Sequence, residues 1–256
     1  MGSEWLDYER PIVRVVRLEA HIEEARAWNV AVYGQVLERL NNRWGGTLAV
    51  TGQQVTVSLT PPSAETTAGL RVDIRAGMKS ADGKWTALVG QSAVALEYHR
   101  DSDEEEYRGW KECLERLKDV LEVSSEVSGG QRFGRVVLSY VNELPFSDIA
   151  ELGQWVDVEV GGTPARVGGP SNFIVGWREQ HEAGTLQVVL EGTGVQGRGI
   201  QLSFTLTGKR MTGGGIDAVQ EEAKMAHEAI SRRFHPPEGL ARPKLVEYMR
   251  PGRVAA

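Results

Sequence analysis

The chain has 256 residues, of which 41% are hydrophobic and 25% are charged, and its formal net charge is -6. This composition is ordinary for a folded globular protein with a substantial core. The negative charge disfavours non-specific binding to nucleic acid, because neutralising phosphates requires a local excess of Lys and Arg. The single cysteine excludes an intrachain disulfide, and no stretch approaches the roughly 18 apolar residues of a membrane span. We therefore expect a cytoplasmic protein that does not enter a membrane.

The first half of the chain predicts a β-α-β-β-β-α order. The expected elements are a strand at 11–22, a helix at about 24–43, three strands within 47–100 and a helix at 104–122. The helix at 104–122 has the strongest periodicity, since Trp110, Leu114, Leu117 and Leu121 recur at spacings of three and four. Asp101 to Asp103 supply candidate N-caps for it.

The second half predicts a similar order. The expected elements are a strand at 132–144, a short helical stretch at 146–155, three strands within 171–208, a helix at 215–234 and a short helix around Pro243–Met249. Leu186, Val188 and Leu190 alternate with Gln187, Val189 and Glu191, as expected for a strand that has one buried and one solvated face. The prolines at 236 and 237 end the helix at 215–234.

The repeated order predicts an internally duplicated α+β fold. We expect a first β-α-β-β-β-α unit at 1–130, a second at 131–235 that shares the same sheet, and a C-terminal tail at 236–256. Such units combine into a curved antiparallel sheet with two long helices packed on one face, as in helix-grip and TATA-binding-protein-like (TBP-like) folds. This architecture provides a groove or cavity and does not by itself specify a reaction.

Three stretches resemble an uncharacterised bacterial family that is known only by a numbered sequence model and is sporadically distributed. They are YRGWKECLERL at 107–117, RVVLSYVNEL at 135–144 and AHEAISRRF at 226–234. The first is similar to the family's aromatic-Gly-Trp helix opening, the second to its "RYVN" strand and the third to its closing helix. This chain departs from the pattern at Ser139, where a basic residue is expected, and at Glu143. The resemblance implies an accessory role, such as defence or toxin control, and no particular activity.

The catalytic motifs in the sequence fail on their context. The G-x-G-x-x-G at 192–197 precedes a predicted strand, whereas a dinucleotide site needs a helix there. His227-Glu228 opens an H-E-x-x-H pattern, but Ser231 stands at the second histidine, and a helix-surface pair is the alternative. Cys113 has no histidine near it in sequence and is expected to be packed. We predict no catalytic residue, no metal site and no cofactor, and an enzymatic role is not favoured.

Basic residues in or near the predicted strands are the candidate binding residues. They are Arg71, Arg75, Arg135, Arg178, Lys209 and Arg210. A sheet face that carries several of them could bind phosphates or an acidic partner, although cross-strand pairing with Glu and Asp is the commoner arrangement. Gly213, Gly214 and Gly215 precede a predicted helix, so their N–H groups could bind an anion, or they could form a simple turn.

Three functions follow as hypotheses. The first is a non-enzymatic binding or regulatory protein that acts through a protein partner, with the Gly-rich loop at 161–169 and the exposed tail after Pro237 as candidate contacts. The second is a small-molecule or nucleotide binder with a cavity between sheet and helices. The third is recognition of nucleic acid on the polar sheet face, which the net charge disfavours. The sequence does not fix the oligomeric state.

Overall fold

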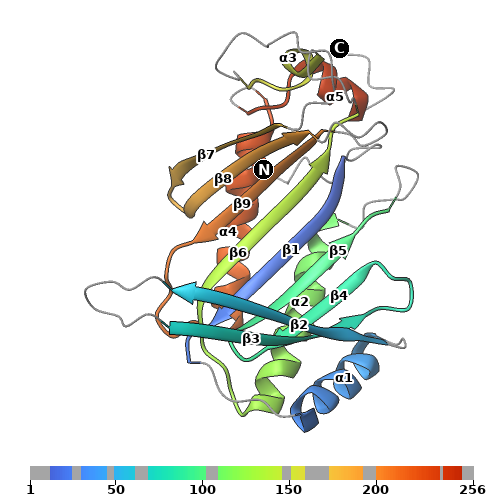
Figure 1. The fold of residues 1–256 in the computed structure, drawn as a ribbon, viewed down its shortest axis with the longest axis vertical. Helices are drawn as coiled ribbons and strands as arrows, with labels where there is room; N and C mark the ends of the chain where they lie inside the picture. The colour runs from blue at the N-terminus through green and yellow to red at the C-terminus, as the bar shows by residue number, and fades with distance from the viewer. Residues whose placement is uncertain are drawn as a thin grey trace.

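The computed structural model describes residues 12–24, 30–44, 49–60, 69–101, 109–145, 151–158, 173–192, 200–236 and 239–249. Nine strands form one antiparallel sheet in the order β2-β3-β4-β5-β1-β6-β9-β8-β7 (Figure 1). The strands are β1 (Val13–Ile22), β2 (Ala49–Thr60), β3 (Gly69–Lys79), β4 (Trp85–Gly90), β5 (Ala93–His99), β6 (Phe133–Glu143), β7 (Phe173–His181), β8 (Gly184–Gly192) and β9 (Gln201–Gly208). The mixed α+β class and the antiparallel sheet predicted from the sequence are confirmed.

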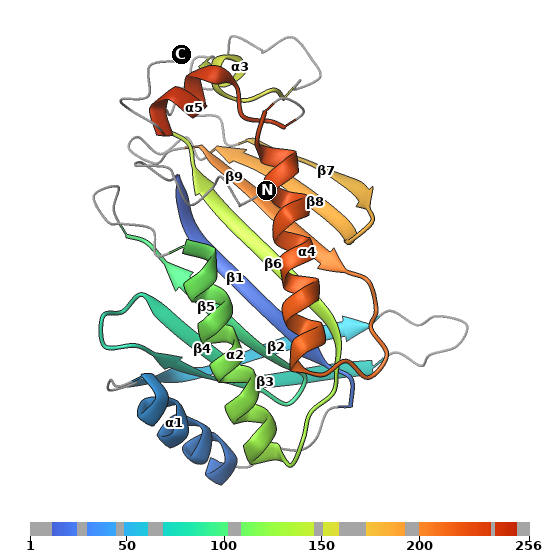
Figure 2. The ribbon, with the colours of Figure 1, turned by 180° about the vertical axis from the view of Figure 1, so that it is seen from behind.

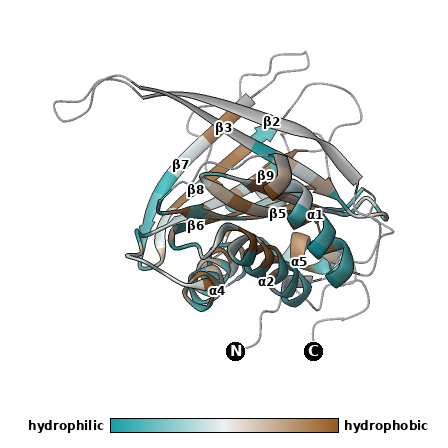
Figure 3. Ribbon diagram, turned by 90° about the horizontal axis from the view of Figure 1, so that it is seen from below, coloured by the Kyte–Doolittle hydropathy of each residue, from teal (hydrophilic) through white to brown (hydrophobic). Residues whose placement is uncertain are grey.

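The two long helices pack on one face of this sheet (Figure 2). The helices are α1 (Val30–Trp44), α2 (Gly109–Ser128), α3 (Leu152–Trp155), α4 (Ile216–Phe234) and α5 (Pro243–Met249). The helix α2 contacts β5, α4 contacts β6 and β9, and α1 packs against α2. Seen from below, the helices gather on one side, and the edge strand β7 and the coloured part of β3 rise away from them, so the face without helices is concave (Figure 3).

Alternation along the strands separates the two faces. Val16 of β1 stands opposite Tyr98 of β5 and Tyr140 of β6, and all three side chains are buried under the helices. The next residue in β1, Arg17, is only half-buried and points to the concave face. The hydrophobic core therefore lies between the sheet and the helices, and the polar alternate positions form the opposite surface.

Several predicted boundaries are corrected. The segment at 47–100 holds four strands, because Gln91 and Ser92 form a turn that divides β4 from β5. Glu24 lies in a bend rather than in a helix, and α2 continues to Ser128, beyond the predicted end at residue 122. Residues 102–108 and 146–150, which include parts of two predicted helices, lie outside the described residues.

The predicted short helix near the C-terminus is present as α5, but it is packed and not a free extension. Leu245 and Met249 are buried, and the ring of Tyr248 contacts Trp155 of α3 with 6.0 Å between ring centroids. Ala241 also forms an isolated β-bridge with Val156. The prediction of an exposed tail is therefore wrong for the described part of this segment.

Candidate functional site

The concave face is the surface that the helices leave open, and its side chains follow from the strand register. One row crosses six strands through Glu97, Arg17, Ser139, Thr205, Gln187 and Arg178. Within this row the Ser139 and Thr205 hydroxyls are hydrogen-bonded at 3.0 Å. Charged groups lie toward the two sides of the row, whereas its centre carries only hydroxyl and amide groups.

The centre of the concave face forms what we call the uncharged patch. It consists of nine half-buried side chains: Val137, Ser139 and Val141 on β6, Ser203, Thr205 and Thr207 on β9, and Thr185, Gln187 and Val189 on β8. The register places them as three rows on three neighbouring strands, with Thr205 in the middle. Charges begin only at its border, for example at Arg135 and Glu191.

A charge network lies beside the uncharged patch. The Arg75 guanidinium of β3 reaches across β4 and β5 and donates to Glu19 of β1 at 2.9 Å, while Arg17 donates to the other carboxylate oxygen at 2.6 Å. The alanines at 93 and 95 of β5 leave room for this long side chain. Burial alone would raise the pKa of the Glu19 carboxyl, but the hydrogen bonds and charges of Arg75 and Arg17 lower that pKa to about 2.

The six predicted cations do not form one continuous basic surface. Arg75 is 8% exposed and paired with Glu19. It therefore serves in cross-strand pairing within the sheet and not in binding a phosphate or an acidic partner. Arg135 and Arg178 are exposed on the concave face, on either side of the uncharged patch. Lys209 and Arg210 are exposed just after β9, and the side chain of Arg71 lies outside the described residues.

The predicted anion site at the start of α4 is largely occupied by the chain itself. The Gly213 N–H donates to a carboxylate oxygen of Glu23 at 2.9 Å, and the Gly214 N–H donates to the Phe133 carbonyl at 3.1 Å. Gly213 has a φ of 64°, and the Arg132 side chain fills the position of a Cβ. Gly215 is the N-cap of α4 and makes no side-chain cap hydrogen bond. The glycines therefore serve as a strand-to-helix turn, which was the alternative reading.

A polar cluster that the sequence analysis missed is buried under the helices. His227 of α4 is 4% exposed, its Nδ1 lies 2.8 Å from the Tyr140 hydroxyl, and its ring stacks on Trp110 of α2 at 4.3 Å between ring centroids. Burial, together with the nearby His235, lowers the pKa of His227 to about 4. The prediction of a helix-surface histidine is therefore wrong. The cluster joins the three stretches that resemble the bacterial family.

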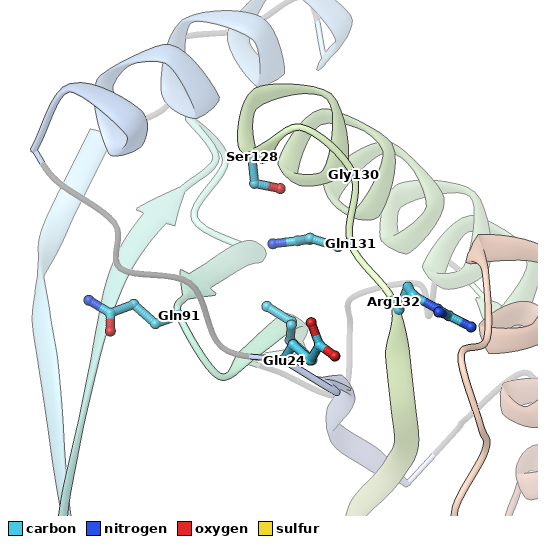
Figure 4. Close-up of a pocket in the computed structure, with 7 residues that line it drawn as sticks. Glu24, Gln91, Ser128, Gly130, Gln131 and Arg132 are labelled. Atoms are coloured by element: carbon cyan, nitrogen blue, oxygen red, sulfur yellow. The ribbon is translucent and has the colours of Figure 1, made fainter.

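Two hollows in the surface are candidate ligand sites. The first, at the end of α2, has a volume of about 40 Å³ and is lined by Glu24, Gln91, Gln131 and neighbouring residues (Figure 4). The second has a volume of about 450 Å³ and lies between the β7–β8 turn and α4, lined by His181, Met225 and mainly charged neighbours. The first has room for only a few water molecules, and the second is an open surface hollow without a Trp, Tyr or Phe wall.

Within the described segments, no three His, Cys, Asp or Glu side chains are grouped so that they could hold a metal ion. No helix in that part of the chain is long and apolar enough to cross a membrane. No protein-family model and no curated protein sequence matches this chain. The resemblance to the bacterial family stays a prediction.

Proposed function

We propose that this chain is a non-enzymatic binding protein that recognises a protein partner through its concave face, with the uncharged patch at the centre of the contact. The observation that carries the proposal is the absence of charge at all nine positions of the patch on an open sheet face. Charged residues are mostly exposed on protein surfaces, whereas the central part of a protein interface is depleted in them. The patch shares this lack of charge with an interface core.

The rim of the concave face supports the same role. Ile174 of β7 is 74% exposed, and β7 is an edge strand whose pairing with β8 has no bulge. Charged residues such as Arg17, Arg178 and Glu191 border the patch. An uncharged centre with a charged rim is the usual arrangement of an interface between two proteins.

The other two hypotheses have less support. A small-molecule binder would use an enclosed, largely apolar pocket, and the larger hollow is open and has four charged residues among the eight that line it. Binding to nucleic acid would use a dense row of cations, but Arg75 and Arg17 are engaged with Glu19 and Glu97. A protein partner remains the hypothesis that fits the concave face best.

We propose that the chain is an internal duplication of the helix-grip or TBP-like kind. The supporting observation is that β1 and β6, which open the two units, lie side by side at the centre of the sheet, and each unit returns to the centre through its last strand. The accessory role in defence or toxin control rests on the sequence resemblance alone and stays part of the hypothesis.

Affinity purification from a nuclease-treated lysate of the native host tests the proposal. The variant Thr205→Tyr adds bulk without charge at the centre of the uncharged patch and keeps a side chain that suits a strand. The control Met225→Tyr places the same bulk on α4, at a residue that is 43% exposed on the other side of the molecule. We expect at least a tenfold loss of the retained protein with Thr205→Tyr and no loss with Met225→Tyr. Equal retention by both variants, or a wild-type protein that elutes alone as a monomer, would refute it.

A further inference from the structure

We infer that the partner presents an acidic segment to the concave face, with carboxylates placed at Arg135 and at Arg178. This inference rests on the proposed function, because it specifies the chemistry of the partner at the same surface. It concerns the charges at the border of the uncharged patch and not the patch itself.

The first support is that the acidic side chains of the concave face are mostly neutralised within the chain. Glu19 pairs with Arg17 and Arg75, and Glu97 also pairs with Arg17. Glu143, at the end of β6, accepts a hydrogen bond from Arg14 at 2.6 Å. These pairs leave little negative charge for a basic partner to recognise.

The exposed cations beside the patch are not neutralised in this way. No described residue forms a hydrogen bond or an ion pair with Arg135 or Arg178, and among the described side chains bordering the patch the one acidic residue in the same situation is Glu191. These unneutralised side chains are therefore two arginines and one glutamate, and their sum is positive although the whole chain carries a net charge of -6. Charge complementarity then favours an acidic partner.

The register sets the spacing of the two contacts. Arg135 lies four residues from Ser139 along β6, and Arg178 lies three strands away in the row of Ser139. With about 4.8 Å between strands and about 3.4 Å per residue, the two Cα atoms are about 20 Å apart across the patch. An extended segment of about six residues, or a helix of about thirteen, covers this distance. Uncharged side chains between two acidic ends would then lie on the patch.

A nucleic acid offers the same negative charge but fits the face less well. Its phosphates would be regularly spaced, whereas the face offers two separated guanidinium groups with uncharged side chains of the patch between them. Glu191 would also lie close to such a backbone. We therefore assign the site to an acidic protein segment, and nucleic acid is one of the outcomes that the test distinguishes.

Zero-length cross-linking tests the inference, because a carbodiimide couples carboxylates to amines but not to guanidinium groups. The variants Arg135→Lys and Arg178→Lys keep the positive charge and add a reactive amine at each position. They are incubated with native lysate, with and without nuclease treatment, then cross-linked and mapped by mass spectrometry. Lys111 of α2, whose side chain is 87% exposed on the helix side, is the control amine in the same molecule. The double reversal Arg135→Glu/Arg178→Glu measures how much retention depends on the two charges.

The inference predicts cross-links from residues 135 and 178 to Asp or Glu of a retained protein, none from Lys111 to that protein, and at least a tenfold loss of retention in the double reversal. Retention that is lost with Thr205→Tyr but unaffected by the double reversal, without cross-links, would overturn the acidic partner and leave the proposed function intact. Retention that disappears only after nuclease treatment would assign the face to nucleic acid instead. Retention that is indifferent to both Thr205→Tyr and the double reversal would overturn both proposals.

Discussion

The buried His227 predicts a specific dependence of stability on pH. Its imidazole is enclosed by Trp110 and Tyr140, and its pKa is lowered from 6.5 to about 4 in the folded protein. When the pH falls below 6.5, the unfolded chain takes up a proton at this histidine, whereas the folded chain does not. The contribution of this group to the free energy of unfolding is therefore fully present above pH 6.5. It decreases as the pH falls from 6.5 toward 4, and it does not decrease further below pH 4.

The expected size of the effect follows from the two pKa values. Between pH 7 and pH 4.5 the linkage amounts to about 2 kcal/mol of unfolding free energy. The lowered pKa of Glu19, about 2, contributes only below pH 4.5, because its unfolded value is 4.5. Burial raises the pKa of Glu222, which works in the opposite direction, so the effect of His227 must be read as a difference between two proteins.

Urea unfolding of the wild type and of His227→Gln at pH 7, 6, 5 and 4.5 measures this difference. The variant is expected to be less stable at pH 7, since it loses the ring stacking on Trp110, but its curve should lack the loss of about 2 kcal/mol on acidification. The variant His181→Gln, at a half-exposed histidine of β7, is the control and should follow the wild type. Parallel pH curves for the wild type and His227→Gln would show that this histidine is not kept neutral by its surroundings.

Two further predictions concern the sheet. Replacing Arg75 by Met leaves the buried carboxylate of Glu19 with one cation fewer, and urea unfolding should show a loss of about 2 kcal/mol in the free energy of unfolding. Arg178→Met, at an exposed site, is the control and should cause almost no loss. Equal effects of the two variants would mean that the Arg75 pair is unimportant for stability. Gly184 has a φ of 146°, and a Cβ there would lie 2.2 Å from a backbone carbonyl oxygen of β9, so Gly184→Ala should cost about 3 kcal/mol in the same assay. A neutral effect of Gly184→Ala would contradict the close approach of Gly184 to the backbone of β9. Gly34 of α1 is the contrasting glycine, because it has open space around it, and Gly34→Ala should stabilise the protein by up to about 1 kcal/mol.

The elements were predictable where periodicity is strong. Leu186, Val188 and Leu190 alternate in the sequence and are all buried in β8, and the helix predicted at 243–249 has the bounds of α5. The turn at Gln91 and Ser92 was missed because apolar residues continue on both sides of it, so a two-residue turn leaves little trace in the pattern.

The candidate site was harder to predict, because its parts come from distant strands. Arg75 and Glu19 are 56 residues apart, and Tyr140 and His227 are 87 residues apart, so their pairing depends on the strand order and the packing of α4. The uncharged patch did leave a signal, since three successive alternate positions in the middle of each of β6, β9 and β8 are Val, Ser, Thr or Gln without charge. A search for charged motifs does not detect a surface defined by the lack of charge.

Methyl NMR of the valines in the bound and free protein tests the central claim most directly. Val137, Val141 and Val189 lie on the uncharged patch, whereas Val120 and Val219 are buried in the helices. If the concave face binds the partner isolated from the native host, the three patch valines should shift or broaden and the two helix valines should stay unchanged. Shifts confined to the helix side, with the patch valines unchanged in a saturated complex, would contradict the account.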